Sequence, residues 1–185
     1  MNKKDVVAVV LGGPPSEAEV SRRTGAAIAE ALREKGYNAV EVELVPEKLV
    51  EQLKEIDAKV VFNAVHGMYG EDGRLQSMLE AIKMPYTGSG VLASAVAMDK
   101  IATKRFLISA NISTPKSLMY NKRFDKDAEL IEKEIIATFG VPVVIKAADQ
   151  GSSIGVEIVK SEADVKTALE NVFKYSDLVL VEECI

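Results

Sequence analysis

The sequence predicts an α/β protein in which a domain built on a parallel sheet is followed by an α+β lobe. Three observations indicate this class. Short β-branched runs alternate with segments of helical periodicity, 48% of the 185 residues are apolar, and the pattern of elements changes near residue 100. Alternating strands and helices typically pack as a parallel sheet covered by helices. We place the domain boundary within residues 95–115 and divide the chain into residues 1–96 and 97–185.

Each element of the first domain is predicted from a local pattern. Apolar, β-branched runs predict buried strands, and the run 39–44 alternates apolar residues with Glu, which indicates a sheet edge. Apolar residues recur at helical spacing from Val20 to Leu32, and Gly36 follows as a stop signal. The predicted strands are Val6–Leu11, Ala39–Leu44 and Val60–Val65, and the predicted helices are Glu19–Lys35, Pro46–Lys54, Arg74–Ile82 and one within Ser94–Ala110.

The second lobe begins after a turn at Ser113–Lys116, which leads into a strand. A charged amphipathic helix is predicted next, and the apolar runs that follow it predict three further strands with one helix between the last two. The predicted helices are Asp127–Phe139 and Glu162–Phe173, and the predicted strands are Val143–Lys146, Val156–Lys160 and Leu178–Glu183.

Composition excludes several classes of protein. The net charge of −5 argues against a general nucleic-acid binder, which usually presents a basic face. No apolar run approaches the roughly 20 residues that cross a bilayer, and the first one is too short for a signal peptide. The single cysteine, Cys184, cannot form an intrachain disulfide, which fits a cytoplasmic protein. One histidine and one cysteine exclude a Cys/His zinc site.

The most informative segment of the chain is the loop that follows Lys146. Gly151, Ser152, Ser153 and Gly155 come between two apolar runs. Glycines let backbone N–H groups approach an anion, the serines add hydroxyl donors, and the lysine adds a positive charge. These features favour a nucleotide polyphosphate, although a hairpin turn has the same composition. The Walker A pattern is absent.

Other candidate ligand residues lie near predicted strand or helix ends. Glu19 is in the first turn of a helix after a glycine-rich loop, and His66 follows a strand and is flanked by glycines. Ligands bind at the carboxyl ends of strands in an open parallel sheet, but helix capping would also explain Glu19 and a structural role would explain His66. Lys100 and Lys104, taken alone, are predicted to be solvated. Glu182 and Glu183 end the last strand and point to opposite faces, so one of them could accept a hydrogen bond from an adenine amino group.

Seven motifs, taken together and in order, resemble the D-alanine–D-alanine ligase family of the ATP-grasp superfamily. They are LGG at 11–13, E-x-E-V-S at 17–21, HG-x-x-GEDG at 66–73, YTGSG at 86–90, MDK at 98–100, K-x-x-x-x-GSS-x-G at 146–155 and the Glu pair at 182–183. The resemblance implies an amino-terminal substrate domain, 1–96, and the first half of an ATP-grasp nucleotide-binding module, 97–185. It also implies an enzyme that joins two D-alanines through an acylphosphate, using ATP and Mg²⁺, for peptidoglycan synthesis.

The resemblance assigns roles residue by residue. Glu19 corresponds to the acid that holds the ammonium of the first D-alanine, and His66 to the histidine near its carboxylate. Ser152 corresponds to a serine that is hydrogen-bonded to that acid and also belongs to the phosphate loop. The implied catalytic residues are Glu19 and Ser152, and the implied ATP-binding residues are Lys100, Lys146, Gly151, Ser152, Ser153, Glu182 and Glu183.

The chain also departs from the family pattern. Ala147 stands where the family usually has Pro, and the carboxyl-terminal half that carries the metal ligands is absent. We therefore assign no metal ligand here, expect the isolated 185-residue chain to be inactive, and expect an unpaired edge strand near residue 180. The family implies a homodimer. A D-alanine–D-lactate or D-alanine–D-serine ligase, a divided enzyme with a separate carboxyl-terminal half, and a non-catalytic binding module remain alternatives.

Overall fold

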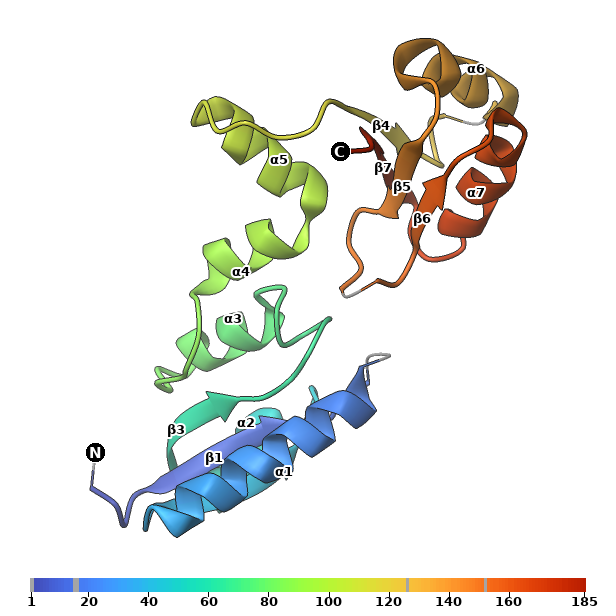
Figure 1. The fold of residues 1–185 in the computed structure, drawn as a ribbon. Coiled ribbons are helices and arrows are strands. Elements are labelled where there is room, and N and C mark those ends of the chain that lie inside the picture. The colour runs from blue at the N-terminus through green and yellow to red at the C-terminus, as the bar shows by residue number, and fades with distance from the viewer. Residues whose placement is uncertain (1, 15–16, 126, 152) are drawn as a thin grey trace. The chain divides into compact units, whose positions relative to one another are not determined.

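The computed structural model describes residues 2–14, 17–125, 127–151 and 153–185. The chain divides into two compact units, Met1–Ala97 and Met98–Ile185, whose elements are labelled in Figure 1. Each unit is described by itself. Within the described residues, no helix combines the length and the apolar character needed to cross a membrane.

The first unit contains a parallel three-stranded sheet in the order β2-β1-β3. Its strands are β1 (Val6–Leu11), β2 (Asn38–Glu43) and β3 (Ala58–Asn63). The predicted edge position of β2 is confirmed. The strand β1 lies in the centre, and Val7 to Leu11 are all buried, since both faces of the sheet are covered.

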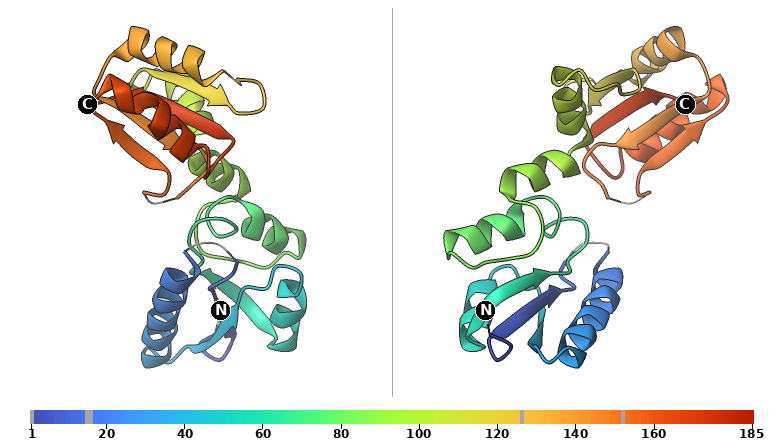
Figure 2. Two further views of the ribbon diagram at one scale, coloured as in Figure 1. Left: turned by 90° about the vertical axis from the view of Figure 1, so that its right-hand side faces the viewer. Right: turned by 60° about the vertical axis from the view of Figure 1, so that its left-hand side comes forward.

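Helices cover the two faces of this sheet, as Figure 2 shows. Helix α1 (Ala18–Glu34) packs on the face that carries Val9 and Leu11, whereas α2 (Leu49–Glu55) and α3 (Arg74–Ala81) pack on the face that carries Ala8 and Val10. The two faces alternate along β1 because successive side chains of a strand point in opposite directions. The predicted α/β architecture of this part is therefore confirmed.

The helix predicted within Ser94–Ala110 is instead two helices, α4 (Val91–Met98) and α5 (Lys100–Ser109). Asp99 separates them because its backbone is extended, with φ −87° and ψ 104°. Its carboxylate accepts hydrogen bonds from the N–H groups of Ile101 and Ala102 at 2.9 Å and so caps α5.

The second unit contains an antiparallel four-stranded sheet in the order β4-β7-β5-β6. Its strands are β4 (Ser117–Asn121), β5 (Val143–Ala147), β6 (Val156–Val159) and β7 (Leu178–Glu183). The expectation of an unpaired edge strand near residue 180 is wrong. Strand β7 is central, because β4 pairs with it on one side and β5 on the other.

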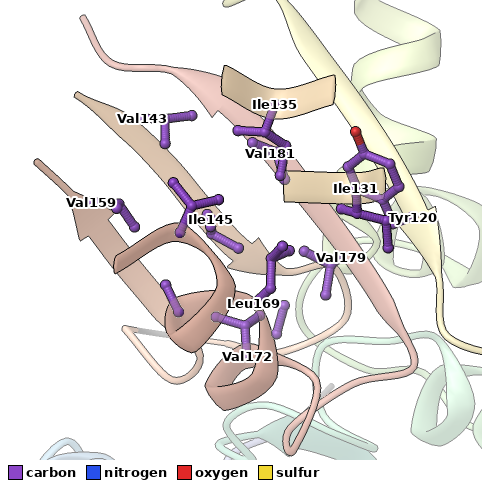
Figure 3. Close-up of a cluster of buried hydrophobic side chains, with 13 residues drawn as sticks. Tyr120, Ile131, Ile135, Val143, Ile145, Val159, Leu169, Val172, Val179 and Val181 are labelled. Carbon is purple, nitrogen blue, oxygen red and sulfur yellow. The ribbon is translucent and has the colours of Figure 1, made fainter. Parts of the chain in front are cut away.

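Helices α6 (Ala128–Phe139) and α7 (Val165–Val172) cover one face of this sheet. A 3₁₀ turn at Glu162–Asp164 precedes α7. Figure 3 shows the buried cluster between sheet and helices, which includes Ile135, Ile145, Leu169 and Val181. The opposite face of the sheet is free of these two helices and packs partly against α5.

Candidate nucleotide and amino-acid sites

One face of the second unit's sheet gathers the charged side chains that the sequence singled out. Val179 and Val181 of β7 point into the core under α6 and α7, so Leu180 and Glu182 point to the other face. Lys146 of β5 is paired with Leu180 in the antiparallel register, and Glu182 is its diagonal neighbour. The strand period and the register together bring Lys146 and Glu182 into contact.

Glu182 lies at the centre of a network of charged groups. Its Oε2 accepts a hydrogen bond from Lys146 Nζ at 2.5 Å, and its Oε1 accepts one from Lys104 Nζ at 2.6 Å. Lys104 also donates to Thr114 Oγ1 at 2.8 Å. The side chain of Glu182 is 9% exposed and that of Lys104 is 4% exposed, whereas Lys146 retains 29%.

Lys104 is the site residue that the sequence reasoning missed, because it was predicted to be solvated. A local signal of its burial exists. Lys104 follows the buried Ile101 by three residues and therefore lies on the same helical face, the one that packs on the sheet. An amphipathic reading of α5 centred on Ile101 would have placed Lys104 inside.

Two opposing effects set the pKa of Glu182. Burial of the carboxylate acts to raise the pKa, but the hydrogen bonds and positive charges of Lys104 and Lys146 together outweigh it, so the pKa lies below its usual value. Glu182 is therefore ionised at neutral pH and holds both ammonium groups.

Lys100 lies at the start of α5, beside the loop that joins β5 to β6. Its Nζ donates to the carbonyl of Gln150 at 2.5 Å, and its N–H donates to the carbonyl of Ala148 at 2.9 Å. The pKa of Lys100 is lowered, first by burial and then by the positive charge of Lys146. An anion bound between the two ammonium groups would relieve their repulsion.

The glycine-serine loop has the tight geometry that its composition predicts. Gly155 has φ +65°, and a Cβ atom there would lie 2.8 Å from the Cβ of Ala147. The carbonyl of Gly155 accepts a hydrogen bond from the N–H of Ala147 at 2.7 Å, which closes the base of the loop. Gly151 is half-buried and Ser153 is exposed. Ser152 lies outside the described residues.

Glu183 contacts the backbone of the segment before β4 and not the lysines around Glu182. Its Oε1 accepts a hydrogen bond from the backbone N–H of Lys116 at 2.7 Å, next to the pairing of β4 with β7. The structure therefore gives Glu182 a place in the cluster of lysines and gives Glu183 a contact with the backbone of the neighbouring segment.

His66 lines a cavity of about 370 Å³ in the first unit. Its Nε2 is 3.2 Å from Thr24 Oγ1, and its Nδ1 is 3.6 Å from Glu71 Oε1. Thr24 and Glu71 line the same cavity, as do Asn63 and Ser94. The cavity therefore presents hydroxyl, amide, imidazole and carboxylate groups, which suit a small polar ligand.

Glu19 does not line this cavity. Its side chain is 77% exposed, and its carboxylate is 3.9 Å from Arg22 at the start of α1. An exposed ion pair of this kind contributes little to stability, so the carboxylate is available to a ligand. The structure does not bring Glu19 and His66 together in one pocket of the described residues.

The N–H groups of Gly12 and Gly13, which follow β1, donate hydrogen bonds to side chains of the first unit. The carboxylate of Glu43, on β2, accepts hydrogen bonds from the N–H of Gly13 at 3.1 Å and from the guanidinium of Arg22 at 2.7 Å. Its pKa is lowered, chiefly by the hydrogen bond from Arg22. The buried hydroxyl of Ser21 accepts from the N–H of Gly12 at 2.8 Å and donates to the carbonyl of Ala64 at 2.7 Å. These hydrogen bonds fix the backbone of Gly12 and Gly13.

The chemistry of the second unit's cluster fits a nucleotide. Two partly exposed ammonium groups beside a loop with glycines suit phosphate oxygens, and a buried carboxylate at a strand end suits a hydrogen-bond donor on a base. Among the described residues, no group of three or more His, Cys, Asp or Glu side chains is placed to hold a metal ion.

Two protein-family models match the chain. Residues 41–89 match a model described as the D-ala D-ala ligase N-terminus, and residues 106–185 match one described as the D-ala D-ala ligase C-terminus. Among curated relatives, a D-alanine--D-alanine ligase of Carboxydothermus hydrogenoformans is 44% identical over 179 residues. One of Moorella thermoacetica is 46% identical over 178 residues. They cover 97% and 96% of this chain, which spans 57% of the length of each relative.

Solved structures show the same likeness. The D-alanine--D-Alanine ligase from Bacillus anthracis matches 98% of this chain with a TM-score of 0.85 and 35% identity, and the match spans 58% of that protein. A structure of the B. anthracis ligase described as complexed with ATP matches 98% of this chain with a TM-score of 0.83 and 32% identity, over 59% of that protein.

Proposed function

Because the chain belongs to the D-alanine–D-alanine ligase family, we propose that it forms part of an ATP-dependent ligase that joins two D-alanines. In this proposal residues 1–96 bind the first amino acid, and residues 97–185 form the first part of the nucleotide site. The dipeptide product would serve peptidoglycan precursor synthesis. The observation that carries the proposal is the contact of Lys146 with Glu182 beside Lys100 and the glycine-serine loop.

Each residue of the nucleotide site has a chemical task in this proposal. Lys100 and Lys146 bring positive charge to the phosphates, and N–H groups of the loop around Gly151 and Ser153 donate to phosphate oxygens. Glu182 accepts a hydrogen bond from the adenine amino group on a carboxylate oxygen, since each oxygen has two lone pairs. From the family resemblance we also assign Ser152 as a catalytic and ATP-binding residue and Glu183 as an ATP-binding residue.

The amino-acid site is assigned to the first unit. Glu19 offers an exposed carboxylate to the ammonium of the first D-alanine, and His66 offers an imidazole N–H to its carboxylate. In this proposal an oxygen of this carboxylate would take the γ-phosphoryl group of ATP with release of ADP, giving an acylphosphate. The amine of the second D-alanine would then attack the acyl carbon, and phosphate and a proton would leave as the peptide bond forms. The chain's own residues contribute by holding the substrates in position and by placing positive charge where negative charge develops.

Catalysis also requires Mg²⁺ in this proposal, because phosphoryl transfer depends on a cation to neutralise the phosphates. No described residue is assigned to that cation. We propose that the Mg²⁺ ligands lie in a polypeptide equivalent to the part of the relatives that this chain does not match. We also propose that the 185-residue chain alone binds nucleotide without turnover.

Nucleotide binding is tested directly by isothermal titration calorimetry of the 185-residue chain with ADP. Replacing Lys146 with Met should weaken ADP binding at least about tenfold, the loss of one charge-assisted contact. The matched control is Lys160→Met, which removes the same charge from an exposed position after β6 and should leave the affinity unchanged. A wild-type chain that does not bind ADP, or equal losses in both variants, would contradict the assignment.

Turnover is tested by measuring phosphate release from Mg-ATP with and without D-alanine. The isolated chain should release none, and adding a polypeptide equivalent to the rest of a relative should restore D-alanine-dependent release. Release by the chain alone would overturn the proposed need for that polypeptide. Binding without restored turnover would favour a module that only binds ligand.

We also propose that the chain forms a homodimer through its first unit. Helix α4 consists of apolar and small residues, and Leu92 on it is 72% exposed. Light scattering after gel filtration should give twice the mass of the chain. The variant Leu92→Glu should shift the mass toward that of one chain, and an unchanged dimer mass would place the interface elsewhere.

A further inference from the structure

Lys104 is buried in a way that lysines rarely are. It lies in the middle of α5, only 3% of the residue is exposed, and its ammonium contacts Glu182 Oε1 and Thr114 Oγ1. Lysine is among the residues that are almost never fully buried unless they are paired. Taking an ammonium and a carboxylate out of water costs several kcal/mol per ion, so this pair is weak evidence for a stabilising role.

The geometry of Glu182 indicates what Lys104 does instead. One carboxylate oxygen is held by Lys104 from the buried side, and the other holds Lys146, whose side chain is 29% exposed. Because a carboxylate is planar and rigid, fixing Oε1 also fixes the direction of Oε2. The position of the Lys146 ammonium therefore depends on Lys104 through Glu182.

We propose that Lys104 is a positioning residue that orients Glu182, and through it Lys146, for nucleotide binding. The inference rests on the proposed nucleotide site but assigns to it a residue that touches no nucleotide. Lys104 is 4% exposed at its side chain and lies behind Glu182, so its effect is indirect. Its positive charge also keeps Glu182 ionised, because burial alone would favour the protonated carboxyl.

A double-mutant cycle on ADP affinity tests the indirect route. Lys104→Met keeps the length of the side chain but removes the charge, and it should weaken ADP binding at least about tenfold. Glu182→Gln should also weaken binding, and the double variant should bind within about twofold of Glu182→Gln, because residues that act through one another are not additive. The matched control is Arg105→Met, which removes one positive charge from an exposed position of the same helix.

A second measurement needs no nucleotide. Carbon-13 labelling of Glu side chains, with Glu182 assigned by the Gln variant, gives the pKa of this carboxyl in the ligand-free chain. In Lys104→Met that pKa should rise by about one unit or more, since an opposite charge within contact distance typically lowers a carboxyl pKa by one to three units. It should not change in Arg105→Met. If the Met variant does not fold, Lys104→Arg, which keeps the charge, should retain the low pKa.

The outcomes are distinct. Additive losses in the cycle, or full ADP affinity in a folded Lys104→Met, would overturn the positioning role. An unchanged Glu182 pKa in Lys104→Met, or a pKa raised to its usual value in a folded Lys104→Arg, would overturn it as well. If the wild-type chain binds no ADP, the proposed function fails, and the pKa of Glu182 still decides whether Lys104 controls this carboxylate.

Discussion

Replacing Glu182 with Gln should destabilise the second unit far more than the first. The substitution keeps the volume of the side chain but leaves the buried ammonium of Lys104 without its charged partner. At an effective dielectric constant of about 20, unit charges 2.6 Å apart attract with roughly 6 kcal/mol before the cost of desolvation is counted. Removing one partner of a buried pair typically costs about 3–5 kcal/mol. We expect about 3 kcal/mol, because the Gln carbonyl remains an acceptor.

Hydrogen exchange read by mass spectrometry measures this effect in each unit separately. Peptides from β5 and β7 should lose about 3 kcal/mol of opening free energy in Glu182→Gln, whereas peptides from β1 should lose none. The matched control is Glu183→Gln, on the next residue of β7. Its half-exposed carboxylate accepts a hydrogen bond from the N–H of Lys116, which the amide oxygen can also accept, so its loss should stay below about 1 kcal/mol.

The loss of opening free energy in Glu182→Gln should depend on pH. The pKa of Glu182 is lowered in the folded chain, so its stabilisation is fully present above the ordinary Glu pKa of about 4.3 and is lost as the pH falls through the lower folded value. The difference between wild type and Glu182→Gln should therefore shrink in that acidic range. A difference that does not change with pH, or one no larger than that of Glu183→Gln, would refute the reasoning.

Three further substitutions test the packing by urea denaturation. Gly155→Ala should destabilise the second unit by about 1–3 kcal/mol, because at φ +65° an added Cβ would lie 2.8 Å from the Cβ of Ala147; a loss below about 0.5 kcal/mol would show that the loop accommodates the methyl group. Ile145→Ala should cost about 2–5 kcal/mol, since Ile145 is fully buried, while Ile158→Ala on the neighbouring strand, 61% exposed, should cost under about 0.5 kcal/mol; similar losses would contradict the core described here. Ser21→Ala should cost about 1–3 kcal/mol, because a buried N–H and a buried carbonyl lose their partner; a loss below about 0.5 kcal/mol would show that water replaces the hydroxyl.

Local patterns in the sequence predicted most helices and strands, because the spacing of apolar residues and the positions of glycine reflect the conformation of neighbouring residues. The run Val6–Leu11 became a strand buried on both faces, and the alternation after Ala39 indicated the sheet edge that β2 occupies. The split of the helix near residue 99 was missed, although an Asp before a helical run is a common cap signal. The place of β7 was predicted wrongly, because its pairing with β4 joins residues that are 57 to 65 positions apart in the sequence.

The sequence alone determined the alternation of strands and helices, the family resemblance and the residue types of the proposed nucleotide site. These follow from side-chain period, backbone freedom at glycine and the chemistry of Lys and Glu, all of which are properties of neighbouring residues. Tertiary structure alone decided that Glu182 lies between Lys146 and Lys104, because strand register and the packing of α5 bring together groups that are 36 and 78 residues apart. Lys104 was predicted to be solvated from its residue type, but the packing of α5 buries it and makes it the hydrogen-bond partner of Glu182.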